Sequence, residues 1–452
     1  MSATLLRPAA ETPPSARPPA RRGSALTMVT VYLALLIGWP SSVTISAFGS
    51  LGRPAVLWGL GLLVWWVLTR LQEGDDRGTQ RRPQPVRWAY GALLVVVLIS
   101  FAAAMFRGQP GDQVTVAISS VLRILSWGGV LLVLADGIRT REELEQLLGR
   151  LTLAGTLLAG LGLLQFVLQQ SMLDWFGNLP GLSADLGGVD SRGAFTRAAG
   201  TAAHPLEYTA VICAVLPLAV TVGLARARAG RGRLPWTWIP AGVLVLAALL
   251  SVSRSAVVGL VVAVLLSLPA LPRTYRWIVA LSCMGAVMAV IALVPGMYGT
   301  MTELFTGATE DPSTLSRTNA LAHVPDFVAA SPVIGLAFGT FLPRYYIFDN
   351  QWVLLTLELG LVGAAAFTLL VLSAVWSSAN AARRAAAPGP DAVARGIAAS
   401  MLTVSVMFLF FDGLSFTMSG GMFFLLAGAA AAARAVARPG HPATRVRSRN
   451  VT

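Results

Sequence analysis

The sequence has 452 residues, of which 55% are apolar and 12% are charged, and its mean hydropathy is +0.68. This composition excludes a soluble multidomain protein and is typical of a polytopic membrane protein. The formal net charge is +13, and all 34 basic residues are arginine, so the positions of the arginines decide between nucleic-acid binding and membrane topology.

Apolar windows of roughly 17–25 residues predict membrane-spanning helices. Residues 1–24 form a Pro/Ala/Arg-rich tail that is too polar to pack and is expected to be disordered. A membrane domain over 25–433 and a basic tail over 434–452 follow. The predicted fold is all-α, with about twelve transmembrane helices and a long extracytoplasmic loop between the ninth and the tenth. The expected spans are 25–40, 54–69, 88–106, 115–135, 149–168, 204–224, 236–250, 255–272, 277–295, 351–376, 396–411 and 413–433.

The arginines are distributed unequally between the two sides that this order of spans defines. With the amino terminus inside, 26 arginines fall in the tails and cytoplasmic loops, seven fall outside, and Arg123 lies within a span. This bias follows the positive-inside rule and predicts that both termini are cytoplasmic. The basic charge therefore indicates topology and contact with the anionic lipid bilayer, and no nucleic-acid partner is expected.

The cytoplasmic connections are too short for a catalytic domain, so any chemistry is expected in two longer outer segments, 169–203 and 296–350. These segments and the short outer turn 251–256 each carry an arginine in a small-residue setting: Arg197, Arg254 and Arg317. For each one alone, the alternative is a guanidinium that snorkels to the membrane interface. Together they favour a shared anionic ligand, because the planar guanidinium binds phosphate oxygens in a bidentate manner.

Several common kinds of site are missing from the sequence. It contains no Walker A loop, no HExxH, no Cys/His metal spacing, no GxSxG elbow, and no DxD pair in an outer loop. Cys213 and Cys283 lie in apolar spans, so no disulfide framework is expected. We therefore predict neither a metal site nor a cofactor, and an anionic leaving group would be neutralised by arginine.

The stretch "YYIFDNQWVLLTLELGLVGAAAF" places polar residues at the mouth of a predicted span and one carboxylate, Glu358, inside it. If both carboxylates are helical, Glu358 lies about half a turn away from Asp349, so the two are not expected to form an acid/base pair. Intramembrane carboxylates usually face the bundle interior and are paired. We expect Glu358 to hold an arginine (Arg123, Arg254 or Arg317) or a backbone turn. The alternative is a protonated glutamic acid that is hydrogen-bonded to a neighbouring helix.

Four short motifs occur in order along the chain. The segment "TRAAGTAAHPLEYTAV" resembles an arginine before a "GTF.HPN" box, with Leu206 in place of the asparagine. The segment "SVSRSAVVGL" resembles "LSRGA", and Arg317 with "SPVIGLAFGTF" resembles an arginine followed by "PL.G.G.G.F". The segment "DNQWVLLTLELGLVG" resembles "HN.YL..L.E.GL.G". Together these motifs resemble the O-antigen ligase and polymerase family of bacterial surface-polysaccharide enzymes, and the matching block covers about 190–370.

The resemblance implies transfer of a glycan from an undecaprenyl-diphosphate carrier to an acceptor hydroxyl on the outer face of the bacterial cytoplasmic membrane. The donor would be the lipid-linked oligosaccharide and the acceptor a glycan or a lipid-linked sugar. Other polysaccharide-assembly membrane proteins are further candidate partners. Ligases of the family have a histidine where this chain has Asp349, so the departure favours a polymerase over a ligase.

The expected roles follow from the chemistry of such a transfer. Arg197, Arg254 and Arg317 would bind the diphosphate, and Asp349 would remove the acceptor proton. His323 is the second candidate base, although a histidine that is hydrogen-bonded within its loop is the more common case. Glu358, Asn350 and Gln351 would position the site. Two alternatives remain open: a flippase or transporter for lipid-linked oligosaccharides, and a non-catalytic assembly partner.

Overall fold

The computed structural model describes residues 24–72, 84–184, 191–192, 195–228, 230, 236–294, 299, 302, 319–384 and 388–437. Except for residue 24, the predicted tail over 1–24 lies outside these residues. Most of the predicted tail over 434–452 also lies outside them. The same holds for much of the outer segment 296–350, including Arg317.

The described chain is a bundle of helices, and each of the twelve predicted spans coincides with one of them. Eight of the described helices are long and apolar enough to cross a membrane, and four apolar helices are shorter. The all-α membrane fold is therefore confirmed, whereas the number of crossings stays a prediction. The long helices are α2 (Pro54–Gln72), α3 (Pro85–Phe106), α4 (Gly111–Gly137), α5 (Arg141–Leu168), α6 (Pro205–Arg228), α9 (Arg273–Leu293), α13 (Gln351–Arg384) and α15 (Thr417–Val436). The shorter ones are α1 (Ala25–Gly38), α7 (Ile239–Leu249), α8 (Arg254–Ser267) and the apolar part Ala392–Met407 of α14 (Pro388–Met407).

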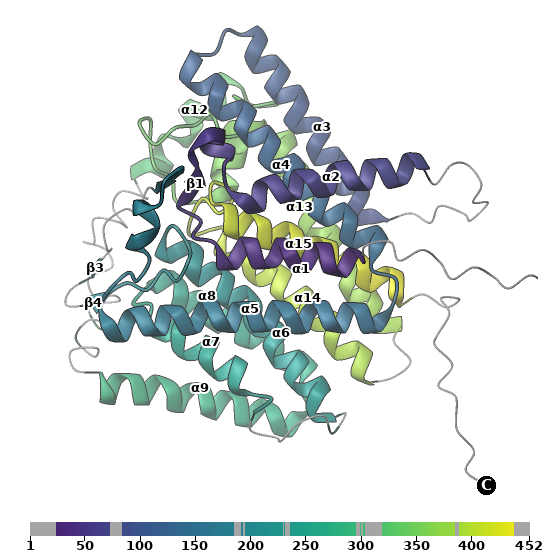
Figure 1. Ribbon diagram of the computed structural model, residues 1–452, viewed down its shortest axis with the longest axis vertical. Helices are drawn as coiled ribbons and strands as arrows, with labels where there is room; N and C mark the ends of the chain where they lie inside the picture. The colour runs from purple at the N-terminus through teal and green to yellow at the C-terminus, as the bar shows by residue number, and fades with distance from the viewer. Residues whose placement is uncertain are drawn as a thin grey trace, which may run out of the picture.

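Small strands and short helices gather at the left end of the bundle in Figure 1. Strand β1 (Val43–Ile45) pairs antiparallel with β2 (Leu182–Ala184), and β3 (Ser191–Arg192) pairs with β4 (Phe195–Thr196). The 3-10 helices η1 (Ser46–Leu51) and η2 (Asp174–Asn178) and the helix α12 (Val324–Ala330) belong to the same end. This is the end where the sequence predicts the outer segments to lie.

The core of the bundle is formed by α6 and α15. Their apolar windows are 94% and 89% buried, whereas that of α9 is 6% buried. Glycines allow the close approach of α15 to α4: a Cβ on Gly420 would lie 2.4 Å from the Trp127 ring, and one on Gly428 would lie 2.9 Å from Leu134. Small residues at helix interfaces are typical of membrane bundles, where close packing replaces the hydrophobic effect.

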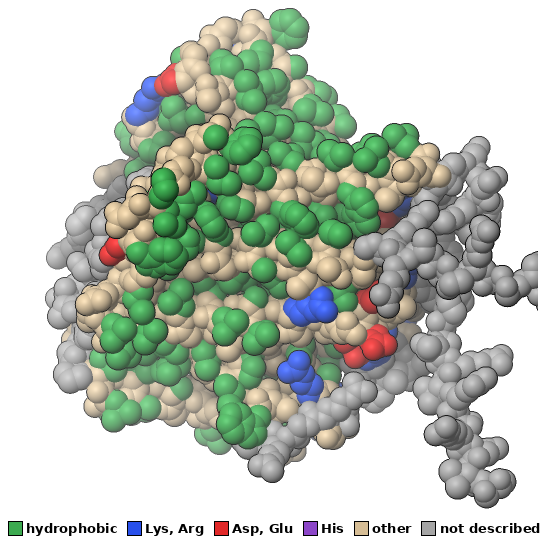
Figure 2. All heavy atoms as spheres, viewed as in Figure 1, with side chains coloured by type: hydrophobic (Ala, Val, Ile, Leu, Met, Phe, Trp, Pro, Cys, Tyr) green, Lys and Arg blue, Asp and Glu red, His purple; other side chains and the backbone are tan. Residues whose placement is uncertain are grey.

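The surface between the two ends of the bundle is apolar. Figure 2 shows hydrophobic side chains spread over the face in view, with few charged side chains among them. Large apolar side chains such as Trp277, Leu281 and Leu157 are exposed. Such a wide apolar surface is expected of a protein that faces lipid.

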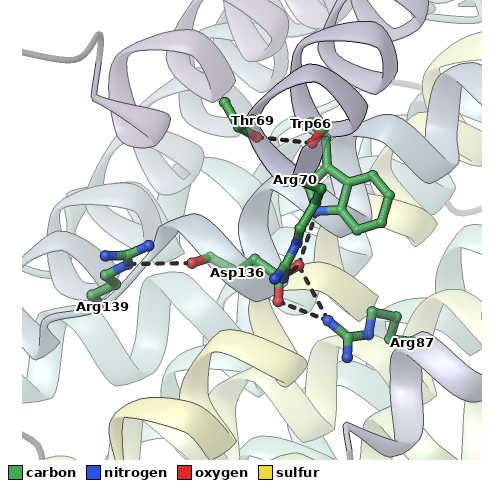
Figure 3. A network of polar contacts seen from close by, with 6 residues as sticks. All are labelled: Trp66, Thr69, Arg70, Arg87, Asp136 and Arg139. Carbon is green, nitrogen blue, oxygen red and sulfur yellow. Dashed lines mark hydrogen bonds and ion pairs between the residues drawn. The ribbon is translucent and has the colours of Figure 1, made fainter. Parts of the chain in front are cut away.

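An ion-pair cluster (Figure 3) lies at the end of the bundle opposite to the strands. Asp136, near the end of α4, accepts hydrogen bonds from the guanidinium groups of Arg70 and Arg87 and from the indole N–H of Trp66. The Asp136 carbonyl accepts a further bond from Arg139. The cluster joins α2, α3 and α4 at the end where the sequence predicts cytoplasmic arginines.

The structure corrects two boundaries. The last helix continues to Val436, so the predicted tail begins later than residue 434. Arg434 lies in the last turn of α15, with its guanidinium carbon 4.2 Å from the centre of the Trp376 ring. The tenth predicted span is longer than expected, since α13 continues to Arg384, and it is broken at Gly360, whose φ of 68° and ψ of −175° are not helical.

Candidate functional site

The segment 332–341 enters the bundle and pairs with α13 at its break. The Leu361 N–H donates to the Pro332 carbonyl at 2.9 Å, and the Ala337 N–H donates to the Glu358 carbonyl at 2.9 Å. Two glycines make this approach possible, because a Cβ on Gly360 would lie 2.1 Å from the Val333 oxygen. A Cβ on Gly335 would lie 2.3 Å from the Glu358 carbonyl. Irregular backbone is stable at this depth only when other protein groups satisfy it, as they do here.

The Glu358 side chain holds the end of this entering segment. Its Oε1 accepts a hydrogen bond from the Phe341 N–H at 3.3 Å, and the Gly339 N–H also bonds to the carboxylate. The residue is 2% exposed, and its carbonyl accepts a bond from the Ser100 hydroxyl of α3. Glu358 is therefore in contact with a backbone turn, one of the partners considered from the sequence.

An arginine lies near the same carboxylate. Arg123, in the middle of α4, interacts electrostatically with Glu358 and with Asp412. Its guanidinium donates to the Ser415 carbonyl and to the Ser120 hydroxyl, each at 2.8 Å. Arg123, one of the three arginines considered as partners of Glu358, therefore interacts with it, whereas Arg317 lies outside the described residues.

Asp349 and Asp412 interact electrostatically, and both Asp412 and the buried Glu358 interact with Arg123. Asp349 does not belong to α13; it precedes the helix with a positive φ of 46°, which is uncommon for a residue other than glycine. Because Asp349 is not helical, the half-turn geometry expected relative to Glu358 does not apply. Asp412 lies in the α14–α15 connection, over 408–416. Burial raises the pKa of Asp412 to about 6, and the charge on Asp349 adds to the rise, while the Ser415 hydroxyl and Arg123 oppose it.

Asn350 and Gln351 hold the backbone around this carboxylate pair. The Asn350 side-chain oxygen accepts bonds from the N–H groups of Trp352 and Val353, at 3.0 and 3.2 Å, and so caps the first turn of α13. Gln351 is fully buried; its side-chain oxygen accepts a bond of 2.6 Å from the Leu414 N–H, and its own N–H donates to the Phe408 carbonyl. Both residues therefore fix α13 relative to the connection that carries Asp412.

The second candidate base, His323, lies at the start of α12. Its side chain is 47% exposed, its Nδ1 lies 4.0 Å from Asp326, and its ring lies 4.9 Å from the Tyr346 ring. Through Tyr346, its ring belongs to an aromatic cluster that includes Phe327 and Phe341. These contacts agree with a histidine that is held within its loop, which is the alternative that the sequence left open.

The three predicted phosphate ligands are only partly described. Arg197 follows β4 and is half-buried; the adjacent turn is fixed by Gln165, whose side-chain oxygen accepts a 2.7 Å bond from the Gly200 N–H. Arg254 is the first residue of α8, is half-buried, and follows Val252, which has a φ of 49°. Arg317 lies outside the described residues. A shared ligand of all three stays a prediction.

Sequence reasoning missed the buried carboxylate Glu207. It is 0% exposed and accepts bonds from the Ser41 hydroxyl, the Ala203 N–H and the Met418 N–H, at 2.7–2.8 Å. It thereby joins α6 to the segment before β1 and to the first turn of α15. It also interacts with Arg53, which donates to the Ser41 carbonyl and interacts in turn with Arg123. The signal was present, because a carboxylate in an apolar span usually has a partner.

Asp412 was missed for another reason. Asp412 lies between two predicted spans, 396–411 and 413–433, which are separated by this residue alone. No connecting segment was therefore predicted there. The structure ends α14 at Met407 and begins α15 at Thr417. The intervening segment packs against the start of α13, where it is hydrogen-bonded to Gln351. Its residue Asp412 interacts electrostatically with Asp349.

The fold and the site define a multi-helix membrane protein with arginines and carboxylates buried around a segment that enters from one end. Residues 239–368 match the family model described as O-antigen ligase. This match confirms the resemblance to the O-antigen ligase and polymerase family, and it includes Arg254, Asp349 and Glu358. No curated protein matches the chain.

Proposed function

We propose that this protein transfers or polymerises undecaprenyl-diphosphate-linked glycan units onto an acceptor sugar hydroxyl at the outer face of the bacterial cytoplasmic membrane. The observation that supports this most is the electrostatic interaction of Asp349, which lies within the segment that matches the family, with Asp412, which also interacts with the half-buried Arg123. Both termini would be cytoplasmic, as the arginine bias predicts.

In the proposed reaction, the acceptor oxygen forms a bond to the anomeric carbon while the bond from that carbon to the diphosphate oxygen breaks. The acceptor proton passes to the Asp349–Asp412 pair, with Asp349 as the group nearer the entrance to α13. Two neighbouring carboxylates accept one proton readily, because protonation relieves their mutual repulsion. The carrier diphosphate leaves with the bonding electrons.

The negative charge that grows on the diphosphate requires cationic groups, and Arg197, Arg254 and Arg317 are the proposed ones. Arg123 has a different task, since its guanidinium is directed to Ser120 and to the Ser415 carbonyl. It positions the connection that carries Asp412 and offsets the charge of the buried carboxylates. Donors that are already oriented in a dry site stabilise such a charge more strongly than water does.

The test is a reaction with purified protein, a defined lipid-linked donor and a separate acceptor. New glycosidic bonds support the proposal; chains of several repeat units identify a polymerase, and a single transfer identifies a ligase. Movement of the donor across the bilayer without any new bond would instead favour the flippase. Transfer that continues in excess chelator would support the metal-independent reaction, and loss of transfer that a divalent cation restores would overturn it.

Substitutions identify the base. Asp349→Asn and Asp412→Asn should each lower the rate by about 10²–10⁴, the range typical of a lost general base. Asp112→Asn is the matched control, because Asp112 lies at the same end of the bundle but is half-exposed and pairs with Arg344 at 2.5 Å. If Asp112→Asn impaired transfer as much as the other two, the loss would be a general effect of charge, and the proposed base would be wrong.

A further inference from the structure

An apolar cavity of ≈ 570 Å³ lies between α6, α7, α8 and α9, away from the carboxylate pair. Its wall includes Leu216 and Val220 of α6, Val245 of α7, Val264 of α8, and Tyr275 and Cys283 of α9. The lining residues come from the second half of α6, the first two thirds of α7, the last part of α8 and the first two thirds of α9. These portions meet at the end of the bundle where α6 ends and α9 begins, opposite to the strands and to Asp349.

The helix α9 that forms the outer wall lies at the edge of the bundle (Figure 1). It packs against α7, and Trp238 and Tyr275 stack at its first turn with ring centres 5.9 Å apart. Its outer face carries exposed Trp277, Leu281 and Met284, so lipid is the medium around it. An apolar cavity does not hold water, and lipid chains are as apolar as the side chains that line it. A hydrocarbon chain is therefore the occupant that this environment supplies.

The charges beside the cavity identify the headgroup. Arg276 lies one turn before the lining residue Val279 on the same face of α9, and Arg273 begins the helix; both are exposed. Arg395 lies close by, since its guanidinium donates to the Pro269 carbonyl at 2.8 Å. Arginines at the predicted cytoplasmic surface attract anionic headgroups. The carrier diphosphate of the proposed reaction would instead lie at the other end of the bundle, beside Asp349.

We propose that this cavity binds one acyl chain of an anionic phospholipid from the cytoplasmic leaflet, with Arg273 and Arg276 at the phosphate. The lipid fills the space between α9 and the bundle and so fixes α9. That helix leads directly into the outer segment that carries Arg317. The inference concerns a site that the proposed transfer reaction does not use.

The test counts lipids on the full-length, delipidated protein by native mass spectrometry, with phosphatidylglycerol, phosphatidylcholine and undecaprenyl phosphate as probes. We expect one tightly retained phosphatidylglycerol. Gly242→Leu should abolish its retention, because Gly242 lines the cavity and a Cβ there meets no atom within 4 Å. Gly285→Leu is the matched control, since Gly285 also has open space but does not line the cavity. Arg276→Gln should weaken phosphatidylglycerol retention about fivefold and leave phosphatidylcholine unchanged.

Equal retention by the Gly242→Leu and Gly285→Leu variants would overturn the proposal, as would displacement of phosphatidylglycerol by undecaprenyl phosphate. Cys283 gives a second measurement without any change to the cavity. In a Cys213→Ser background, phosphatidylglycerol should slow the reaction of Cys283 with N-ethylmaleimide in detergent, and phosphatidylcholine should slow it less. A rate that is the same with and without phosphatidylglycerol would contradict occupation of the cavity.

Discussion

Replacing Gly360 with alanine should separate the entering segment 332–341 from α13. The φ of 68° and ψ of −175° at Gly360 lie in a region that is essentially restricted to glycine and cost an L-residue about 1–3 kcal/mol. The added Cβ would lie 2.1 Å from the Val333 carbonyl oxygen, and relieving such an overlap typically costs about 1–3 kcal/mol. We therefore expect Gly360→Ala to lower the free energy of unfolding by about 2–6 kcal/mol. The overlap should also break the bond from Leu361 to Pro332 and displace the turn that Glu358 holds.

Two alanine substitutions separate the contributions to this loss. Gly49 also has a positive φ, 53°, but open space around its Cβ position, so Gly49→Ala should cost only the backbone strain. Gly285→Ala has neither strain nor contact and lies in α9, where alanine is the better helix former by about 1 kcal/mol. Unfolding is measured in mixed micelles with increasing SDS, and transfer is measured with excess donor. Gly360→Ala with the stability and activity of Gly49→Ala would refute the proposed role of the entering segment.

Three further predictions concern charged residues. Glu358→Gln should keep part of the transfer activity, because the amide oxygen can still accept the hydrogen bond from the Phe341 N–H. Glu358→Ala should lose more activity and unfold more easily. A Glu358→Leu variant that is fully active and stable would contradict this prediction. Arg254→Ala should slow transfer about 10²–10³-fold at saturating donor, and Arg254→Lys should restore only part of it; full activity with lysine would exclude a bidentate phosphate contact. The rate should fall as the pH drops through about 6, where Asp412 gains a proton, and Asp412→Asn should abolish that fall. An unchanged pH–rate profile in Asp412→Asn would show that this carboxylate does not take part.

The sequence alone determined the class of the fold. Each predicted span coincides with a helix. A segment that crosses the hydrocarbon core must satisfy its own backbone hydrogen bonds, and the length that it needs can be recognised as a run of consecutive apolar residues. The family motifs could also be recognised in the sequence, and they include Gly335, Gly360 and Glu358. A carboxylate within a span was expected to face the bundle interior, and the Glu358 side chain is buried in the structure.

The partners of these residues were decided only by the tertiary structure. Glu358 accepts a hydrogen bond from Phe341, 17 residues away, and interacts electrostatically with Arg123, more than 200 residues away. Asp349 interacts electrostatically with Asp412, which lies in a connection that the apolar windows did not show. Hydropathy is a sum over neighbouring residues, so it locates a helix but not its rotation or its neighbours. The choice among several arginines for one carboxylate depends on which helices pack together, and small residues at their interfaces, such as Gly420 and Gly428 between α15 and α4, set that packing.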